Sequence, residues 1–415
     1  MSVARKPYTV VREPNGLTDV PGFACGATAS GIRGPQSDRL DLGLVYSETP
    51  CTAAGVFTQN KVCAAPVHLC RERLAAGERF HGVLFNSGNA NACTGEQGRA
   101  DAEALLWAAE SAIGAPDGSF FICSTGRIGR DLPMKRMIPG VRRAAEAIGT
   151  TPAEGHAAAD CILTSDTRRK VSTVKVKTAE GAFTIAGIAK GAGMIEPNMA
   201  TMLAFIVTDA AVPARTLQKL LNEGVGPSFN AITVDGDMST NDTVLALANG
   251  VSGVRIRGEL KNAFAAAFNR VCEDLAQLIV GDGEKITKVV ELRVSGARNA
   301  DDARKVARAV GNSLLVKSSW YGNDPNWGRV VDAAGYSGAD LVEEKLTMAY
   351  RASDGAKPVP AFEDGRGVER HLARWKKIVA QQRFIIELDL GLGRGTARLF
   401  ASDLTEGYVN FNKSE

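Results

Sequence analysis

Residues 190–210 read KGAGMIEPNMATMLAFIVTDA and place contrasting demands on the backbone within a short distance. The glycines after Lys190 let the chain turn or approach another group closely. Pro197 excludes a regular helix or a central strand at its position. The unbroken apolar run at 202–207 predicts a strand that is buried on both faces. Thr201 therefore opens a buried strand next to a glycine-rich loop, which indicates a functional site.

Thr201 has two interpretations from its residue type. A threonine at the start of a strand commonly satisfies its hydroxyl locally. The alternative is a nucleophile, whose hydroxyl needs an adjacent base. One such base is the threonine's own α-amine, freed when the preceding peptide bond is cut. Ala200 offers little steric hindrance to such a cut, and the spacing alone leaves both interpretations open.

Composition narrows the class of protein. A chain of 415 residues predicts two or three lobes at about 100–200 residues per domain. The net charge of +3 argues against a nucleic-acid or membrane-surface partner, because such proteins carry a concentrated basic patch. The eight cysteines form no CxxC pair, and the sequence MSVARKPYTV lacks the apolar core of a secretory signal. We expect free thiols and a cytoplasmic location.

Metal binding is not expected from the histidines and cysteines. Cys63, His68 and Cys70 are the one cluster of thiols and imidazole, and their spacing does not match common zinc sites. We interpret them as part of a strand that carries small apolar thiols. Asp235, Asp237 and Asp242 are likewise interpreted as a polar loop satisfied by its own side chains.

Turn residues and apolar periodicity predict the elements around the central stretch. In the first half these are two strands within 53–67 that are joined by a turn at Gln59-Asn60, a helix at 98–113, a strand at 120–124 that ends at Thr125-Gly126, and an antiparallel pair at 171–177 and 183–188. In the second half they are a helix at 260–280, a strand at 287–295, a helix at 300–310, a strand at 313–318, and an antiparallel hairpin at 384–392 and 396–404.

The block KGAGMIEPNMATML closely resembles the self-cleaving centre of the ornithine acetyltransferase family, which is also called the glutamate N-acetyltransferase or bifunctional arginine-biosynthesis acetyltransferase family. Further blocks extend the resemblance over about residues 16–412: GVFT, AAPV, NSGNANACTG, STGRIG, VDGDMSTNDT, GDGE and YGNDPNWGR. The resemblance implies that the Ala200–Thr201 bond is cut autocatalytically. The products would be an α chain, 1–200, and a β chain, 201–415, within one intertwined fold.

The resemblance also implies the roles of individual residues. Thr201 is the nucleophile, Thr125 and Gly126 hold the oxyanion, and the substrate contacts are Thr164, Lys190, Thr201, Glu284 and Asn412. From residue type alone the plainer interpretations are a turn at Thr125-Gly126, a solvated Lys190 and an exposed loop Glu284.

The chain departs from the family pattern at a few positions. Arg127 stands where a small or apolar residue is usual, and Lys285 and Ile286 are bulkier than their counterparts. A threonine contact that the family places after Asn412 has no counterpart before Glu415. These departures put the detail of the substrate pocket in question.

The implied fold is α+β: a four-layer αββα sandwich with the nucleophile at the start of a central strand, and a smaller C-terminal α/β lobe. The implied reaction moves an acetyl group from N2-acetyl-L-ornithine to L-glutamate through an acetyl-threonine, without a cofactor or metal. The implied assembly is a heterotetramer of two α and two β chains, with no nucleic-acid or membrane partner. Use of acetyl-CoA as a donor stays open.

Two other functions remain as alternatives. A self-cleaving aminopeptidase or amidase of the same architecture would pass the acyl group to water, although NSGNANACTG and DPNWGR favour the acetyltransferase. A cleavage-incompetent amino-acid binder would remain one intact chain. The state of the bond before Thr201 therefore separates the enzymes from the binder.

Overall fold

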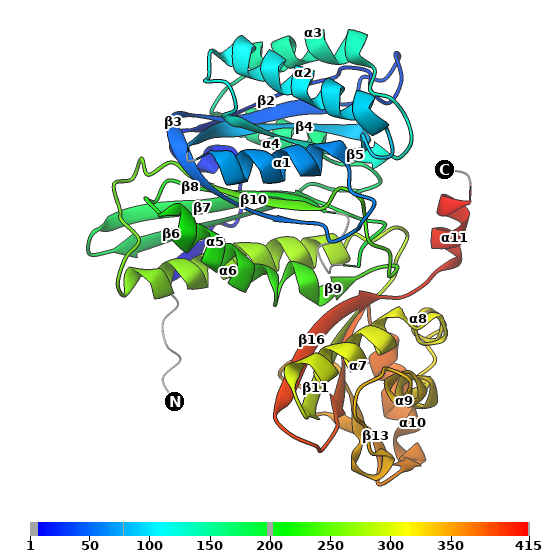
Figure 1. The fold of residues 1–415 in the computed structure, drawn as a ribbon. Helices are drawn as coiled ribbons and strands as arrows, with labels where there is room; N and C mark the ends of the chain where they lie inside the picture. Colours follow the sequence, from blue (N-terminus) through cyan, green and yellow to red (C-terminus); the bar gives the residue numbers. More distant parts are fainter. Residues whose placement is uncertain (1–6, 78, 197–201, 414–415) are drawn as a thin grey trace. The chain divides into compact units, whose positions relative to one another are not determined.

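The structure is a computed structural model that describes residues 7–77, 79–196 and 202–413. The chain divides into two compact units (Figure 1). Unit 1 comprises Met1–Gly191, Pro197–Asn230 and Asp237–Ile279, and unit 2 comprises Ala192–Glu196, Ala231–Gly236 and Val280–Glu415. Mixed α/β structure with a sheet in each unit agrees with the expected class. No helix in the described ranges is long and apolar enough to cross a membrane.

Unit 1 is built on a sheet that, among the described residues, has nine strands. Their order is β1-β6-β7-β8-β10-β3-β4-β5, and β2 also pairs with β3. The bounds are β1 Tyr8–Val10, β2 Phe23–Thr28, β3 Leu42–Phe57, β4 Phe80–Asn89, β5 Phe120–Arg127, β6 Lys170–Thr178, β7 Gly181–Lys190, β8 Leu203–Thr208 and β10 Thr243–Ala248.

The predicted buried strand is confirmed as β8. All six of its residues are buried, and it lies between the antiparallel β7 and the parallel β10. Its apolar side chains fill both faces because the sheet is covered on both sides. On one face Phe205 packs against Phe85 of β4, with ring centroids 5.2 Å apart.

Helices complete the packing of unit 1. They are α1 Ala65–Ala76, α2 Gly95–Ile113, α3 Met134–Glu146, α4 Pro152–Cys161, α5 Ala214–Val225 and α6 Leu260–Val280, with short 3-10 turns at Leu17–Asp19 and Phe229–Ala231. Helices α2 and α3 share an apolar cluster with strands β3–β5, and Figure 1 shows both helices on the same side of these strands. Helix α6 lies against β7, where a Cβ on Gly187 would stand only 2.8 Å from a methyl group of Leu275. Glycine at this position lets the helix approach the sheet closely.

Unit 2 has a mixed sheet in the order β14-β13-β12-β15-β11-β16-β9. Its strands are β9 Ile232–Thr233, β11 Val289–Ala297, β12 Thr347–Arg351, β13 Val359–Glu363, β14 Arg366–Gly367, β15 Arg383–Asp389 and β16 Gly395–Ser402. Its helices are α7 Ala300–Asn312, α8 Leu314–Tyr321, α9 Trp327–Gly335, α10 Leu372–Val379 and α11 Glu406–Asn412, with 3-10 turns at Glu343–Lys345 and Glu369–His371.

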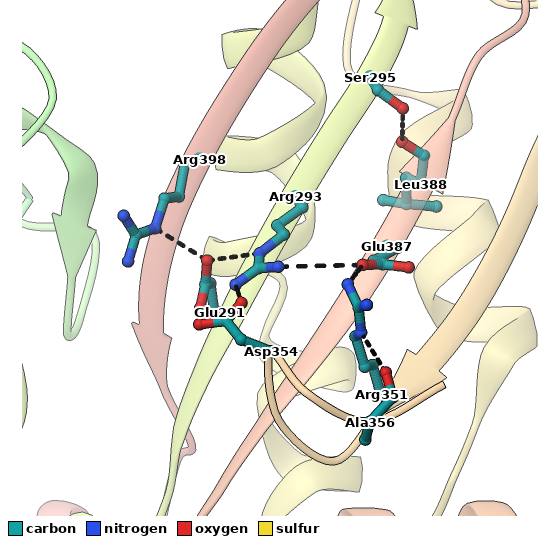
Figure 2. Close-up of polar contacts among 9 residues, drawn as sticks. All are labelled: Glu291, Arg293, Ser295, Arg351, Asp354, Ala356, Glu387, Leu388 and Arg398. Atoms are coloured by element: carbon teal, nitrogen blue, oxygen red, sulfur yellow. Dashed lines mark hydrogen bonds and ion pairs between the residues drawn. The ribbon is translucent and has the colours of Figure 1, made fainter. Parts of the chain in front are cut away.

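The two faces of the unit 2 sheet differ in character. Val290, Leu292 and Val294 of β11 join a buried apolar cluster on one face. On the other face Arg293 binds Glu291 at 2.6 Å and Asp354 at 2.5 Å (Figure 2). The same network also contains Arg351, Glu387 and Arg398. Partly exposed ion pairs of this kind contribute about 0–1 kcal/mol each, so the network gives this face a polar surface and adds little stability.

Two predicted strands are helices. The segment AAPV at 64–67 begins α1, because Pro66 stands in the first turn, where its missing N–H costs no hydrogen bond. His68 and Cys70 are therefore on a helix and not on a strand. The predicted strand at 313–318 is α8, which Ser313 caps by accepting the N–H of Val316 at 3.4 Å.

The predicted hairpin at the C-terminal end is also wrong. Strands β15 and β16 do not pair with each other, because β11 lies between them. Strand β15 runs parallel to β11, and β16 runs antiparallel to it. The glycine-rich segment after β15 instead folds back on β11, where Leu390 donates to the carbonyl of Ser295 at 2.9 Å.

A buried ion pair stabilises unit 1 where β6 begins. Lys170 Nζ lies 2.6 Å from Asp166 Oδ1, and both side chains have no exposed surface. Burial by itself favours the neutral form of Asp166, but the charges of Lys190 and Lys170 and the N–H of Gly191 favour the carboxylate. Together they hold the pKa of Asp166 well below its ordinary value of 3.8.

Asp166→Asn is expected to destabilise unit 1 by about 3–5 kcal/mol, because it leaves buried lysine without its carboxylate. The depressed pKa means that this contribution is complete above about pH 4 and is lost as the pH falls through the lower folded-state value. Urea unfolding at pH 7 and in acid checks both parts. The matched control is Asp160→Asn, which removes a more exposed carboxylate paired with Arg169 at 2.7 Å. Equal unfolding midpoints for the two variants at pH 7 would contradict the prediction.

Candidate functional site

The expected nucleophile and cut bond lie just outside the described residues. Ala200 and Thr201 belong to the segment 197–201, for which the structure gives no description. The next residue, Met202, is buried and held at two points. Its N–H donates to Asp242 Oδ1 at 2.7 Å, and its carbonyl accepts the N–H of Thr243 at 3.0 Å. The chain immediately after position 201 is therefore fixed beside the start of β10.

The expected oxyanion residues lie inside a strand. Thr125 and Gly126 are part of β5, which extends to Arg127, so the prediction that the strand ends at this pair is wrong. Among the described residues β5 is the last strand of its sheet, with β4 as its partner. Alternate N–H groups along such a strand point away from its one partner strand.

Gly126 cannot be replaced by a larger residue without moving β4. Its φ of 131° is a conformation that side chains rarely adopt. A Cβ at this position would stand 2.3 Å from the carbonyl carbon of Gly88. Thr125 beside it is only 5% exposed. The pair thus combines a buried hydroxyl with a closely packed backbone.

Asn241 and Asp242 connect these two parts of the site, and the sequence analysis did not assign them this role. Asn241 Nδ2 donates to the carbonyls of Ser124 at 2.9 Å and Ala90 at 2.6 Å. Asp242 holds the N–H of Met202, as described above. Burial raises the pKa of Asp242 well above its ordinary value, although the Met202 N–H and the charge of Lys190 favour its ionised form. Both residues stand in the block VDGDMSTNDT, which carries the family resemblance but implies no role for either of them.

The Asp166 carboxylate interacts with two of the expected substrate contacts, Thr164 and Lys190. Its Oδ2 accepts the N–H of Thr164 at 2.9 Å, and its Oδ1 accepts the N–H of Gly191 at 2.7 Å. Lys190 at the end of β7 is 2% exposed, and its charge lowers the pKa of Asp166. Lys190 is therefore a buried cation, not the solvated lysine that its residue type alone suggests.

The remaining expected contacts lie together in unit 2. Asn412, at the end of α11, donates from Nδ2 to Glu284 Oε2 at 2.9 Å. The N–H of Glu284 donates to the carbonyl of Ala192 at 3.0 Å. A Cβ on Gly193 would stand about 2.4 Å from the Glu284 carboxylate, so the second glycine of the KGAG segment makes room for this side chain. Glu284 is buried, and not the exposed loop residue of the plainer interpretation.

The bulkier residues after Glu284 turn to other partners within unit 2. Lys285 lies with its ammonium 5.4 Å from the ring centre of Phe411, which is a favourable cation–π distance. Ile286 lies near Gly283, where an added Cβ would stand 3.0 Å from its Cγ2. Thus unit 1 holds Thr125, Gly126, Thr164 and Lys190, and unit 2 holds Glu284 and Asn412.

The expected substrate contacts are polar or charged groups in each unit. In unit 1 these are the buried Lys190 and the half-buried Thr164. In unit 2 they are the buried Glu284 and Asn412, which donates to it. Among the described residues, no three His, Cys, Asp or Glu side chains gather as metal ligands.

The family model and the relatives that match this chain indicate the same family. The family model described as "ArgJ family" matches residues 24–414. The arginine biosynthesis bifunctional protein ArgJ of Geobacter sulfurreducens is 44% identical over 398 residues, which cover 95% of this chain and 98% of that protein. The glutamate N-acetyltransferase of Methanosarcina mazei is 41% identical over 397 residues, which cover 95% and 99%.

A solved structure of Mycobacterium tuberculosis ornithine acetyltransferase complexed with ornithine is 38% identical, covers 46% of this chain and 98% of its own, and has a TM-score of 0.42. The family match and the two relatives span nearly the whole sequence. On that basis the chain belongs to the ArgJ family.

Proposed function

We propose that this protein transfers the acetyl group of N2-acetyl-L-ornithine to L-glutamate in arginine biosynthesis, through an acetyl ester on Thr201. The observation that carries the proposal is the family match over residues 24–414, together with relatives named as glutamate N-acetyltransferase and as bifunctional ArgJ proteins. The proposal includes a cytoplasmic enzyme that is assembled from two α and two β chains and works without a cofactor.

The nucleophile is generated by self-cleavage at Ala200–Thr201. The Thr201 hydroxyl oxygen attacks the Ala200 carbonyl carbon, a C–O bond forms, the C–N bond breaks, and the hydroxyl proton passes to the departing nitrogen. Water then hydrolyses the resulting ester, which leaves a carboxylate on Ala200 and a free amine and hydroxyl on Thr201. The amine supplies the base that a threonine hydroxyl requires.

Acetyl transfer repeats the same chemistry on the substrate. Thr201 Oγ attacks the acetyl carbonyl while its α-amine takes the proton, and the amine then protonates the departing ornithine nitrogen. Thr125 and Gly126 stabilise the negative oxygen of the tetrahedral intermediate. The α-amine of glutamate attacks the acetyl ester in the second half of the cycle and restores the free hydroxyl.

Charged groups orient the two amino acids. We assign Lys190 and Thr164 to the substrate carboxylate, because an ammonium and a hydroxyl can each donate a hydrogen bond to an anion. Glu284, which Asn412 orients by its hydrogen bond, is assigned to the substrate ammonium. The same set would accept ornithine and glutamate because both carry these two charges.

For the architecture we propose a four-layer αββα arrangement around this site. Helices α2 and α3 cover one half of the unit 1 sheet, and α6 lies against β7 in the other half. Phe85 and Phe205 pack between the halves. Thr201 would then stand at the start of the central strand β8, with unit 2 as the smaller lobe.

Thr201→Ala is expected to abolish both reactions, because it removes the hydroxyl that each requires. The purified variant should give one full-length band on a denaturing gel, and acetyl transfer should fall by a factor of about 10³ or more. Thr201→Ser keeps a hydroxyl and serves as the control, which should still be cut. Incubating wild type with N2-acetyl-L-ornithine alone should add one acetyl group to the fragment that begins at Thr201.

The molecule that accepts the acetyl group distinguishes a transferase from an amidase. The acetylated fragment should lose its acetyl group to L-glutamate faster than to water, and loss to water at the same rate would favour the amidase. Replacing the donor by acetyl-CoA in the same assay shows whether the thioester also loads Thr201. A cut Thr201→Ala variant, or an active uncut wild type, would refute the assignment of Thr201.

Thr125→Ala is expected to lower kcat by a factor of about 10² with a smaller change in KM, because an oxyanion donor acts mainly in the transition state. Steady-state kinetics on the cut fraction measure both constants. Arg130→Ala, an exposed position in the loop after the same strand, is the matched control. An unchanged kcat for Thr125→Ala would remove this residue from the oxyanion site.

A further inference from the structure

The chain just before the proposed cut is attached to unit 2 through one carboxylate. The N–H of Met194 donates to Asp235 Oδ2 at 2.6 Å, and the N–H of Ile195 donates to Asp235 Oδ1 at 2.7 Å. The hydroxyl of Tyr408 donates to Asp235 Oδ2 at 3.2 Å. Both oxygens of a single side chain are therefore occupied by two consecutive backbone amides.

Consecutive amides can converge in this way because Met194 has an unusual backbone conformation. Its φ of 57° lies in the left-handed region, which is unfavourable for a residue with a side chain. The Met194 side chain is 38% exposed, so apolar burial contributes little at this position. The hydrogen bonds to Asp235 offset the strain of the turn.

The following residues continue the attachment within unit 2. The carbonyl of Ile195 accepts the N–H of Val234 at 2.7 Å. Glu196 forms an ion pair with Arg308 and accepts a hydrogen bond from Asn312. The last described residues before the segment 197–201 are thus held by neighbours on both sides of the backbone.

We propose that Asp235 is a positioning residue for self-cleavage, which it promotes by holding Met194 in the left-handed turn. The inference rests on the proposed function, because it presupposes the cut at Ala200–Thr201. Intramolecular attack is fast only in the few conformations that align hydroxyl and carbonyl. Each backbone residue that stays free adds conformations in which the hydroxyl and the carbonyl are not aligned. Fixing residues 194–196 in advance removes some of these conformations.

Asp235→Asn tests the proposal because the amide keeps the shape of the side chain but has one acceptor oxygen instead of two. The full chain is made in a cell-free translation mixture, and the uncut fraction is followed over time on a denaturing gel. We expect the variant to be cut about tenfold more slowly than wild type, with the cut fraction transferring acetyl groups at the wild-type kcat. Asp332→Asn, at an exposed carboxylate on α9 of the same unit, is the matched control and should be cut at the wild-type rate.

Glycine at position 194 separates positioning from general structural damage. Because glycine adopts the left-handed conformation without cost, Met194→Gly combined with Asp235→Asn should recover most of the cutting rate. The opposite change, Met194→Val, should slow cutting while Asp235 is intact, since a β-branched residue strongly disfavours positive φ. This exposed substitution keeps the test valid if Asp235→Asn does not fold.

The outcomes are distinct. Wild-type cutting rates in Asp235→Asn, no recovery with glycine, or no slowing in Met194→Val at an unchanged unfolding midpoint would each overturn the role of Asp235. A wild-type chain that is never cut would instead contradict the proposed self-cleavage, and this inference with it.

Discussion

The parallel pairing of β8 with β10 is the constraint on which the rest of the site depends. Strand β8 is buried along its whole length, so its backbone groups must find partners in neighbouring strands. The register that places Leu203 opposite Thr243 also places Met202 beside Asp242. Asn241, one residue earlier, reaches the end of β5. A single polar loop thus ties the start of the central strand to the strand that carries Thr125 and Gly126.

Local sequence patterns were sufficient to predict the helices and strands whose side-chain burial is uniform or strictly periodic. The apolar run at 202–207 gave β8, and the long apolar face at 260–280 gave α6 with the expected bounds. The alternating segment at 171–177 paired with the next strand as predicted. In these cases the side-chain period follows directly from which faces are covered.

Short apolar runs did not distinguish a helix from a strand, because a few residues fit both the helical and the strand periodicity. At 313–318 the sequence SLLVKS suggested a strand, yet Leu314 and Leu315 are 67% and 59% exposed on α8, while Val316 is buried. The hairpin prediction failed for a different reason: pairing β15 with β16 seemed natural from their proximity, but β11 from about a hundred residues earlier lies between them. Strand order in a mixed sheet is a non-local property that turn residues do not determine.

The same limit explains which site residues were found. Thr125, Gly126, Lys190 and Glu284 stand in short motifs that carry the family resemblance, so the sequence predicts roles for them without knowledge of their partners. Asn241 and Asp242 act on Ser124 and Met202, which are 117 and 40 residues away. No spacing rule links such residues, and only the folded sheet brings them together.

Strand order also explains how a cut before residue 201 could leave one functional molecule. Within unit 1, β8 and β10 from the second half of the chain lie between β7 and β3 from the first half. Backbone hydrogen bonds join β7 to β8 on one side and β10 to β3 on the other. Unit 2, made almost entirely from the second half, in turn holds residues 192–196 of the first. Separating the halves would expose the central strands of a buried sheet, so we expect the fold to survive the loss of one covalent bond before residue 201.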